Sequence, residues 1–194
     1  NNFTNAENTL GRIYVVRDPR NVITSFKHHF SLKSIEDAFK VISNKSQLIG
    51  NQETNKQITV RSDKQVCTFI SSWSHHYNSW KINWGNNLLI KYENLVKNPE
   101  KEFGKIKLYL EGMMKSKIDE KKFKQAIREN SFEKLKNLEN KKGFGESAYD
   151  YSAKKELSFF NLGPENNWEK LLDAKIARKI EEEFNKEMLE LGYL

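Results

Sequence analysis

An arginine and a serine eight residues apart, Arg17 and Ser25, are the residues of this chain best suited to bind a phosphate. The apolar run of residues 13–16 predicts a buried strand that ends at Arg17. Pro19 favours a helix start directly afterwards, and Ser25 lies one to two turns into that helix. Ligands of open α/β sheets bind beyond the carboxyl ends of the strands, and a guanidinium offers forked, permanently charged donors. The alternative is an ordinary strand–helix junction with Asp18 as the helix cap.

This stretch resembles the 3′-phosphate-binding motif of the sulfotransferases, which use 3′-phosphoadenosine 5′-phosphosulfate (PAPS) as the sulfuryl donor. In that family an arginine ends a strand and a serine follows eight residues later. Arg17 and Ser25 have this spacing, with Asp-Pro-Arg-Asn-Val at residues 18–22 between them. The resemblance implies that both residues bind the 3′-phosphate of the nucleotide.

Residues 88–92 predict a second strand, which ends in Tyr92 and leads through Glu93 to a helix opened by Pro99. This arrangement is similar to a second sulfotransferase motif, in which a strand ends in Tyr-Glu-Asp-Leu before a proline-led helix. The resemblance implies that Tyr92 contacts the adenine, and an ordinary aromatic residue at a strand end is the alternative. The alternation of strand, turn and helix also predicts an α/β architecture with a parallel sheet.

Asn130, Ser131 and Phe132 open a later helix and are similar to the Thr-Ser-Phe sequence of many sulfotransferases. The resemblance implies that these three residues surround the adenine, with asparagine in place of threonine at position 130. On its own the tripeptide is also a common helix start.

A long polar segment, residues 139–167, departs from the family pattern near its end. Sulfotransferases commonly have Phe-Arg-Lys-Gly there, and the arginine, the lysine and the glycine backbone bind the 3′-phosphate. This chain instead has a phenylalanine followed by Asn161, Leu162 and Gly163. Because each lost charge-assisted hydrogen bond costs about 1.5–3 kcal/mol, we expect weaker nucleotide binding or compensation by nearby lysines. The candidates are Lys141, Lys142 and Lys154.

The catalytic groups of the family have no match in this sequence. Its general-base histidine and the lysine of its phosphosulfate loop both come before the arginine-bearing strand. We therefore expect them upstream of Asn1 and no catalytic residue within this chain. His28 and His29 lie on the Ser25 helix, where the family has a histidine of structural role. The chain is expected to be the C-terminal, 3′-phosphate- and adenine-binding portion of a single domain, residues 1–194.

The composition argues against several other classes. Cys67 is the only cysteine and the four histidines form adjacent pairs, so neither an internal disulfide nor a zinc site is predicted. No apolar run is long enough for a membrane span, and no signal-peptide pattern is present. The net charge is +7, and residues 101–142 hold 13 basic against 7 acidic residues. This segment leaves open a domain that binds nucleic acid, although lysines mixed with glutamates are more typical of solvated helices.

Apolar periodicity predicts the remaining elements. An aromatic stripe predicts a helix over residues 63–83, capped by Asp63, with its aromatic side chains on a buried face rather than stacked on bases. Other helices are expected at 19–30, 34–49, 99–111, 119–129, 131–138 and 173–191, with loops at 50–61 and 139–167.

Together the resemblances imply an α/β fold of the P-loop-NTPase-like, three-layer sulfotransferase type, with a parallel sheet flanked by helices and its N-terminal portion missing. They imply a PAPS-dependent sulfotransferase that acts on a hydroxyl or amine of a small-molecule or glycan acceptor, with 3′,5′-adenosine diphosphate as the product and no metal. A non-catalytic relative that binds the nucleotide is the first alternative, and the nucleic-acid-binding domain is the second. We expect no nucleic-acid partner, a cytoplasmic location and a possible homodimer.

Overall fold

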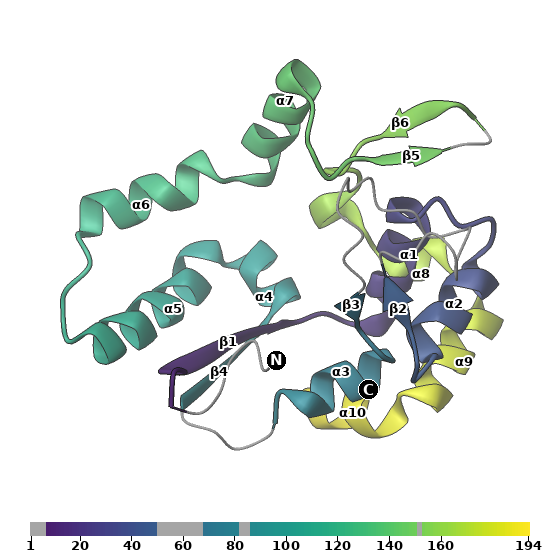
Figure 1. Ribbon diagram of the computed structural model, residues 1–194, viewed down its shortest axis with the longest axis horizontal. Coiled ribbons are helices and arrows are strands. Elements are labelled where there is room, and N and C mark those ends of the chain that lie inside the picture. The colour runs from purple at the N-terminus through teal and green to yellow at the C-terminus, as the bar shows by residue number, and fades with distance from the viewer. Residues whose placement is uncertain (1–6, 50–67, 82–85, 151–152) are drawn as a thin grey trace. The chain divides into compact units, whose positions relative to one another are not determined.

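The computed structural model of the chain describes residues 7–49, 68–81, 86–150 and 153–194 (Figure 1). The chain folds as two units, each made of two separate stretches. The first comprises Asn1–Arg17 and Ser79–Lys134, and the second comprises Asp18–Asn78 and Leu135–Leu194. The boundary therefore falls within the predicted phosphate-binding motif, directly after its arginine.

The sheet of the first unit is a parallel pair of strands. β1 (Gly11–Val16) pairs with β4 (Asn86–Lys91) in a register that runs from Gly11 opposite Asn86 to Val16 opposite Lys91. Parallel strands place their carboxyl ends at the same edge of a sheet. The residues that follow the two strands, Arg17 and Tyr92, consequently lie side by side at that edge. The α/β class with a parallel sheet is confirmed.

Gly11 allows a close approach between β1 and a helix of the same unit. The hydroxyl of Tyr109 donates a hydrogen bond to the Asn86 carbonyl at 2.6 Å and accepts one from the Arg12 N–H at 2.8 Å. A Cβ atom on Gly11 would lie 2.1 Å from that hydroxyl oxygen, so Tyr109 would have to move away from the strand. Glycine at this position therefore lets one tyrosine join the starts of both strands.

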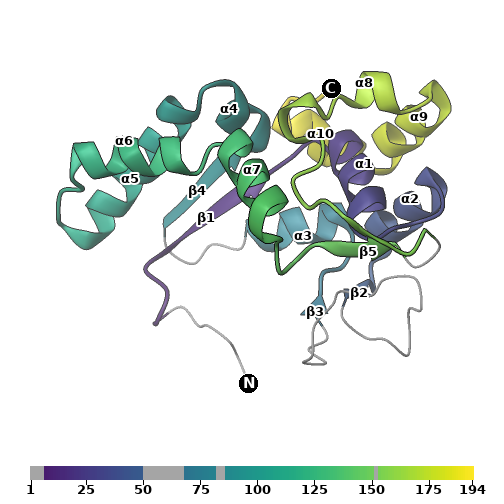
Figure 2. The same ribbon diagram turned by 90° about the horizontal axis from the view of Figure 1, so that it is seen from above.

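Helices follow β4 along the chain. α4 (Tyr92–Lys97) and α5 (Pro99–Met114) come directly after the strand, and α6 (Glu120–Glu129) runs back alongside α5 (Figure 2). Asp119 caps α6 by accepting a hydrogen bond from the N–H of Lys122 at 2.7 Å. The helices predicted from Pro99 onward and from residue 119 are thus confirmed.

The core of the second unit is built around α1 (Pro19–His29). α2 (Ile35–Ser43) and α9 (Ala174–Glu183) pack against α1 and against each other (Figure 2). The side-chain oxygens of Asp18 and Ser34 cap α1 and α2, and the first of these caps is the alternative that the sequence offered for residues 17–19. The buried apolar cluster consists of Ile23, Phe30, Leu32, Ala38, Ile42, Ile176, Ile180, Phe184 and Met188.

The predicted helix over residues 63–83 is wrong in its described first part. Thr68–Phe69 forms a short strand, β3, which pairs antiparallel with β2 (Leu48–Ile49). Helix α3 covers only Trp73–Ser79. The helix expected over residues 34–49 likewise ends early, because its last residues belong to β2.

Two buried serines explain why α3 starts late. Ser71 has a φ of 58°, which a regular helix does not allow, and Ser72 Oγ accepts a hydrogen bond from the N–H of His75 at 3.3 Å. The two serines therefore mark the start of α3, which the spacing of the apolar residues does not reveal. The predicted cap Asp63 and the predicted loop at 50–61 lie outside the described residues.

The aromatic stripe is buried where it lies on α3 but not before it. Tyr77 is buried, and the ring of Trp73 lies 5.2 Å from that of Phe184 in the core. Phe69, on the strand, is 63% exposed. The apolar spacing that predicts one helix therefore covers two different elements, strand β3 and helix α3.

The segment of residues 139–167, predicted as a loop, contains regular structure. α7 (Phe132–Lys142) extends into it, and β5 (Ala148–Asp150) and β6 (Lys155–Leu157) form an antiparallel hairpin (Figure 1). A 3₁₀ turn, η1 (Gly163–Glu165), follows. The single-helix prediction over residues 173–191 also needs a correction, because two helices form there.

The C-terminal helices α9 and α10 (Asn185–Leu191) meet at Phe184, which is fully buried. Its φ of −112° departs from the helical value and turns the chain there. Gly192 ends α10 with a φ of 66°, a conformation that glycine adopts readily.

Arg20 connects the start of α1 to three other parts of the second unit. Asp18 caps α1 by accepting from the Arg20 N–H at 2.9 Å, and its carboxylate also binds the guanidinium at 2.7 Å. The same guanidinium donates to Glu181 at 2.6 Å and to the Tyr193 carbonyl at 2.8 Å. It also lies over the ring of Trp168, 4.0 Å from the centroid. Burial disfavours its charge, but the two carboxylates outweigh that effect and raise the pKa of Arg20.

Replacing Arg20 with alanine should destabilise the second unit strongly. The change leaves Asp18 buried without its cation, and breaking a buried ion pair costs about 3–5 kcal/mol. Urea unfolding should report a loss of this size for R20A and almost none for R178A, which removes an exposed arginine of α9. Equal stability of the two variants would contradict the role given to Arg20.

Candidate functional site

The carboxyl edge of the β1–β4 pair brings together two of the residues predicted from the sequence. The guanidinium of Arg17 lies over the ring of Tyr92, 4.3 Å from its centroid. The parallel register produces this contact, because each residue directly follows its strand. A cation stacked on an aromatic ring at a strand edge offers both a charge for a phosphate and a flat surface for a base.

Asn130 and Ser131, in the same unit, have capping roles in the structure. Asn130 ends α6, and its side-chain amide donates to the Ala126 carbonyl at 2.9 Å. Ser131 Oγ accepts from the N–H of Lys134 at 3.4 Å, at the start of α7. Phe132 is the first residue of α7. The helix-start reading therefore holds for Ser131 and Phe132, whereas Asn130 ends the helix before them. Contact with an adenine stays a prediction.

Ser25 belongs to the second unit, where a buried asparagine holds its hydroxyl. The side-chain amide of Asn166 donates to Ser25 Oγ at 2.8 Å and to the Asn21 carbonyl at 3.1 Å. Its Oδ1 accepts from Thr24 Oγ1 at 2.7 Å. One side chain thus contacts three residues of α1, namely Asn21, Thr24 and Ser25.

A further contact joins α1 to the residues that follow the departing segment. Asn21 Oδ1 accepts a hydrogen bond from the N–H of Trp168 at 2.9 Å, at the start of α8 (Trp168–Leu171). Asn21 and Asn166 were not predicted as site residues. No local signal marks them, because only the fold brings the segment that follows Gly163 onto α1.

The segment Asn161–Leu162–Gly163 leads into a tight turn. Gly163 has a φ of 53°, and its carbonyl accepts from the N–H of Asn166 at 3.2 Å. The Leu162 carbonyl accepts from the N–H of Glu165 at 3.0 Å. The backbone near Gly163 is therefore coupled through Asn166 to the hydroxyl of Ser25.

A cation of α7 reaches this segment. Lys136 Nζ donates to the Asn161 carbonyl at 3.0 Å, and the lysine side chain is half-buried. The three lysines predicted to compensate for the lost cations, Lys141, Lys142 and Lys154, are exposed. Sequence reasoning missed Lys136, which lies 25 residues before Asn161.

Glu139, one turn further along α7, fixes the chain just before this segment. Its buried carboxylate accepts hydrogen bonds from the N–H groups of Phe159 at 2.5 Å and Phe160 at 3.0 Å. It also accepts from the hydroxyls of Ser158 at 2.6 Å and Ser147 at 3.0 Å. Burial opposes ionisation, but the four hydrogen bonds outweigh it and lower the pKa of Glu139.

The histidines of α1 face the same stretch. His28 Nε2 lies 2.9 Å from the Ser158 carbonyl, and because a carbonyl can only accept, this nitrogen is the donor. His29 packs edge-on against Phe159. Burial, reinforced by the charge of His28 and partly offset by Glu146, lowers the pKa of His29. Both histidines thus hold the 158–160 stretch in place, in line with the structural role that the resemblance implies.

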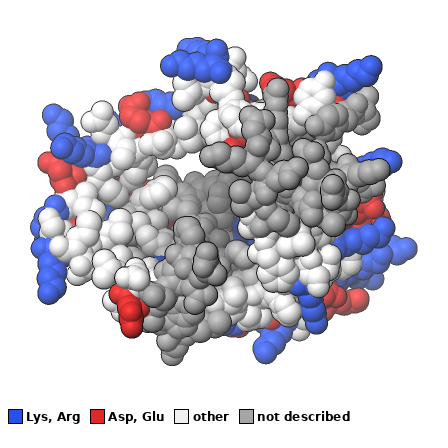
Figure 3. Space-filling model, in the orientation of Figure 1, with Lys and Arg blue, Asp and Glu red and all other residues white. Residues whose placement is uncertain are grey.

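The basic segment of residues 101–142 carries many of its lysines in ion pairs. Its Lys and Arg side chains are interspersed with carboxylates, and they form no continuous stripe on the described part of the face in Figure 3. The pairs are Lys105–Glu102 at 2.7 Å, Lys134–Glu129 at 3.0 Å, Lys117–Glu111 at 3.3 Å, Lys124–Glu120 at 4.0 Å and Lys107–Glu120. Such pairing is typical of solvated helices and does not favour a nucleic-acid interface.

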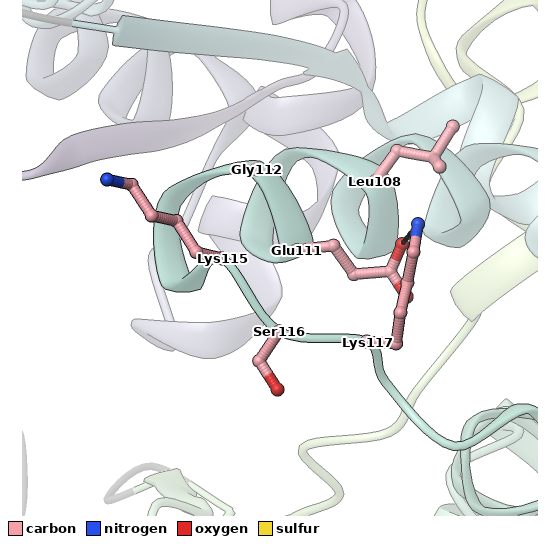
Figure 4. A pocket seen from close by; sticks show the side chains of 6 residues that line it. All are labelled: Leu108, Glu111, Gly112, Lys115, Ser116 and Lys117. Carbon is pink, nitrogen blue, oxygen red and sulfur yellow. Dashed lines mark hydrogen bonds and ion pairs between the residues drawn. The ribbon is translucent and has the colours of Figure 1, made fainter.

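A hollow beyond α5 illustrates this pairing (Figure 4). The carboxylate of Glu111 accepts from the Ile118 N–H at 2.8 Å as well as from Lys117. The N–H of Ile118 and, to a lesser degree, Lys117 lower the pKa of Glu111. These charges are used to close the turn between α5 and α6.

The family of the chain follows from a comparison along its whole length. The family model described as the sulfotransferase domain matches residues 6–192. The chain belongs to the sulfotransferase family. Sulfotransferase motifs recognised at Arg17, Tyr92 and Phe132 thus lie inside the matched region.

Solved structures share the fold of this sulfotransferase chain. The mouse sulfotransferase SULT7A1 complexed with PAP is 18% identical with a TM-score of 0.58, over 91% of this chain and 58% of that chain. Retinol dehydratase in complex with androsterone and inactive cofactor PAP is 17% identical with a TM-score of 0.58, over 91% and 46%. The sulfotransferase chain therefore spans about half the length of these solved relatives. A sequence search among curated proteins gave no significant match.

Two further properties concern the described part of this sulfotransferase. Within residues 7–49, 68–81, 86–150 and 153–194, no three His, Cys, Asp or Glu side chains lie together as a metal site would require. Over the same ranges, no helix has the length and apolar character needed to cross a membrane.

Replacing Glu139 with glutamine should destabilise the sulfotransferase in a pH-dependent way. A carboxylate whose pKa is lowered on folding stabilises the protein above the unfolded-state pKa of about 4.3, and this contribution is lost as the pH falls through the folded-state value. At pH 7 we expect E139Q to lose about 1–3 kcal/mol.

Urea unfolding of the wild type and E139Q from pH 7 down to pH 3.5 measures this difference. The gap between the two proteins should narrow below about pH 4.3. E183Q, at an exposed position of α9, should match the wild type throughout. A gap that stays constant with pH would show that Glu139 acts by packing and not by charge.

Proposed function

We propose that this chain carries the 3′-phosphate- and adenine-binding part of a PAPS-dependent sulfotransferase. The observation that carries the proposal is the placement of Arg17 over Tyr92 at the carboxyl edge of the parallel strands. Family membership supports the reaction class, and PAP is present in the solved relatives named above. The acceptor we propose is a hydroxyl or amine on a small molecule or glycan.

The donor set of the chain fits a nucleotide with a 3′-phosphate. Arg17 offers forked, charged donors to the phosphate, and the Ser25 hydroxyl, oriented by Asn166, offers a further one. Tyr92 and Phe132 supply flat apolar surface for the adenine, and Asn130 and Ser131 supply polar groups. The backbone of Asn161, Leu162 and Gly163 completes the phosphate site in this proposal. Arg17 and Ser25 belong to different units, so their joint contact with one phosphate rests on the sequence motif.

The reaction we propose moves a sulfuryl group from PAPS to the acceptor oxygen or nitrogen, whose proton passes to a base, and leaves 3′,5′-adenosine diphosphate. Contacts with the distal 3′-phosphate fix the position of the donor and supply remote binding energy for the reacting end. The residues described above have this positioning role. None of them is assigned as the general base, since His28 and His29 are used to hold the backbone and the ring of residues 158 and 159.

Replacing Arg17 with alanine should weaken binding of 3′,5′-adenosine diphosphate at least tenfold. The variant loses a charged donor to the 3′-phosphate, and a tenfold change corresponds to about 1.4 kcal/mol. Isothermal titration with 3′,5′-adenosine diphosphate and with 5′-AMP separates this contribution, because 5′-AMP lacks the 3′-phosphate. The affinity for 5′-AMP should change much less.

R178A provides the matched control, since it removes one positive charge from an exposed position on α9. It should bind both nucleotides like the wild type. Unchanged affinity of R17A for 3′,5′-adenosine diphosphate would refute the assignment of Arg17. Tight nucleotide binding without sulfuryl transfer to any acceptor tested would favour the non-catalytic alternative.

A further inference from the structure

The segment that follows Phe160 has neutral side chains where the resemblance calls for two cations. A 3′-phosphate is dianionic at neutral pH, so a site without these cations loses attraction that an arginine and a lysine would supply. We propose that Lys136, on helix α7, is a ligand of the nucleotide 3′-phosphate and supplies the missing charge. The inference rests on the proposed function and extends it to a residue outside the recognised motifs.

The first argument is the position of the ammonium group. Lys136 Nζ donates to the Asn161 carbonyl at 3.0 Å, so the charge lies against the backbone of the segment that lacks its own cations. An ammonium group has three N–H donors and keeps its positive charge whichever acceptors they bind. The side chain is half-buried, which limits both its motion and the screening of its charge.

The second argument is that the segment is held in register with Ser25. The N–H of Asn166 donates to the Gly163 carbonyl at 3.2 Å, and the Asn166 side chain donates to Ser25 Oγ at 2.8 Å. A short series of hydrogen bonds and peptide units therefore leads from the Ser25 hydroxyl through the turn to Lys136. The predicted phosphate ligand and the lysine belong to one connected structure within the second unit.

The third argument concerns Glu139, which follows Lys136 by one turn. A carboxylate so close would oppose an anion if its charge faced the ligand. The oxygens of Glu139 instead accept four hydrogen bonds, two from backbone N–H groups and two from serine hydroxyls. Its charge is thus directed into the chain before Asn161, where it fixes the backbone that Lys136 contacts.

Titration calorimetry on the full chain tests the inference with 3′,5′-adenosine diphosphate and 5′-AMP as probes. K136M should bind 3′,5′-adenosine diphosphate at least tenfold more weakly, with little change for 5′-AMP. K136Q separates the two roles of the side chain, because its amide can still donate to the Asn161 carbonyl but carries no charge. We expect K136Q to lose as much affinity as K136M, and K136R to retain most of it.

Two lysines serve as controls. K179M removes an exposed charge on α9 and should leave both affinities unchanged, while K142M tests an exposed lysine of the same helix. Wild-type affinity in K136Q, or a loss in K142M in place of K136M, would overturn the proposal. Circular dichroism confirms that each variant is folded. If the wild type binds both nucleotides equally, the 3′-phosphate site itself is refuted, and the role of Lys136 with it.

Discussion

The second unit depends on one buried guanidinium. Arg20 lies in the first turn of α1 and binds Asp18, Glu181 and the carbonyl of Tyr193, with Trp168 stacked on its other side. A buried charge is strongly destabilising when a partner is removed, so the loss of one of these contacts weakens the whole arrangement. The start of α1, helix α9, the chain end and α8 are therefore fixed around one group.

Ser25, a proposed phosphate ligand of the second unit, lies on the helix that this arrangement holds in place. Once Arg20 holds Trp168 beside α1, the N–H of Trp168 can reach Asn21, and Asn166 can reach Ser25. Two arginines of one motif thus have opposite tasks. Arg17 extends from the strand end over the ring of Tyr92. Arg20, three residues later, is buried, and its guanidinium binds groups of the protein itself. A positive charge in the motif is not by itself evidence of ligand contact.

Sequence reasoning succeeded where the determining signal is local. Strand β1 and the helix that Pro19 opens follow from short stretches of sequence, and the cap at Asp18 is the alternative that the same stretch offered. The contact between Arg17 and Tyr92 was not predicted and comes from the parallel register of the two strands. Sequence reasoning failed where distant groups decide the structure. The regular spacing of aromatic residues continues across Ser71 and so predicts a longer helix, although α3 begins only at Trp73. Asn166 contacts Ser25, 141 residues away in the sequence, and Lys136 contacts Asn161, 25 residues away. No local spacing rule predicts contacts at these separations.

The departure at Asn161 and Leu162 has a physical explanation in the way the backbone is held. In this chain Glu139 binds the N–H groups before the segment and Asn166 binds the turn after it, so the position of the backbone does not depend on the side chains between them. Coulomb attraction to a phosphate depends on where a charge lies and not on which segment carries it. A lysine from a neighbouring helix can therefore replace cations of the loop, provided that the backbone it contacts stays fixed. The buried carboxylate of Glu139 and the half-buried ammonium of Lys136, one turn apart on α7, meet these two requirements together.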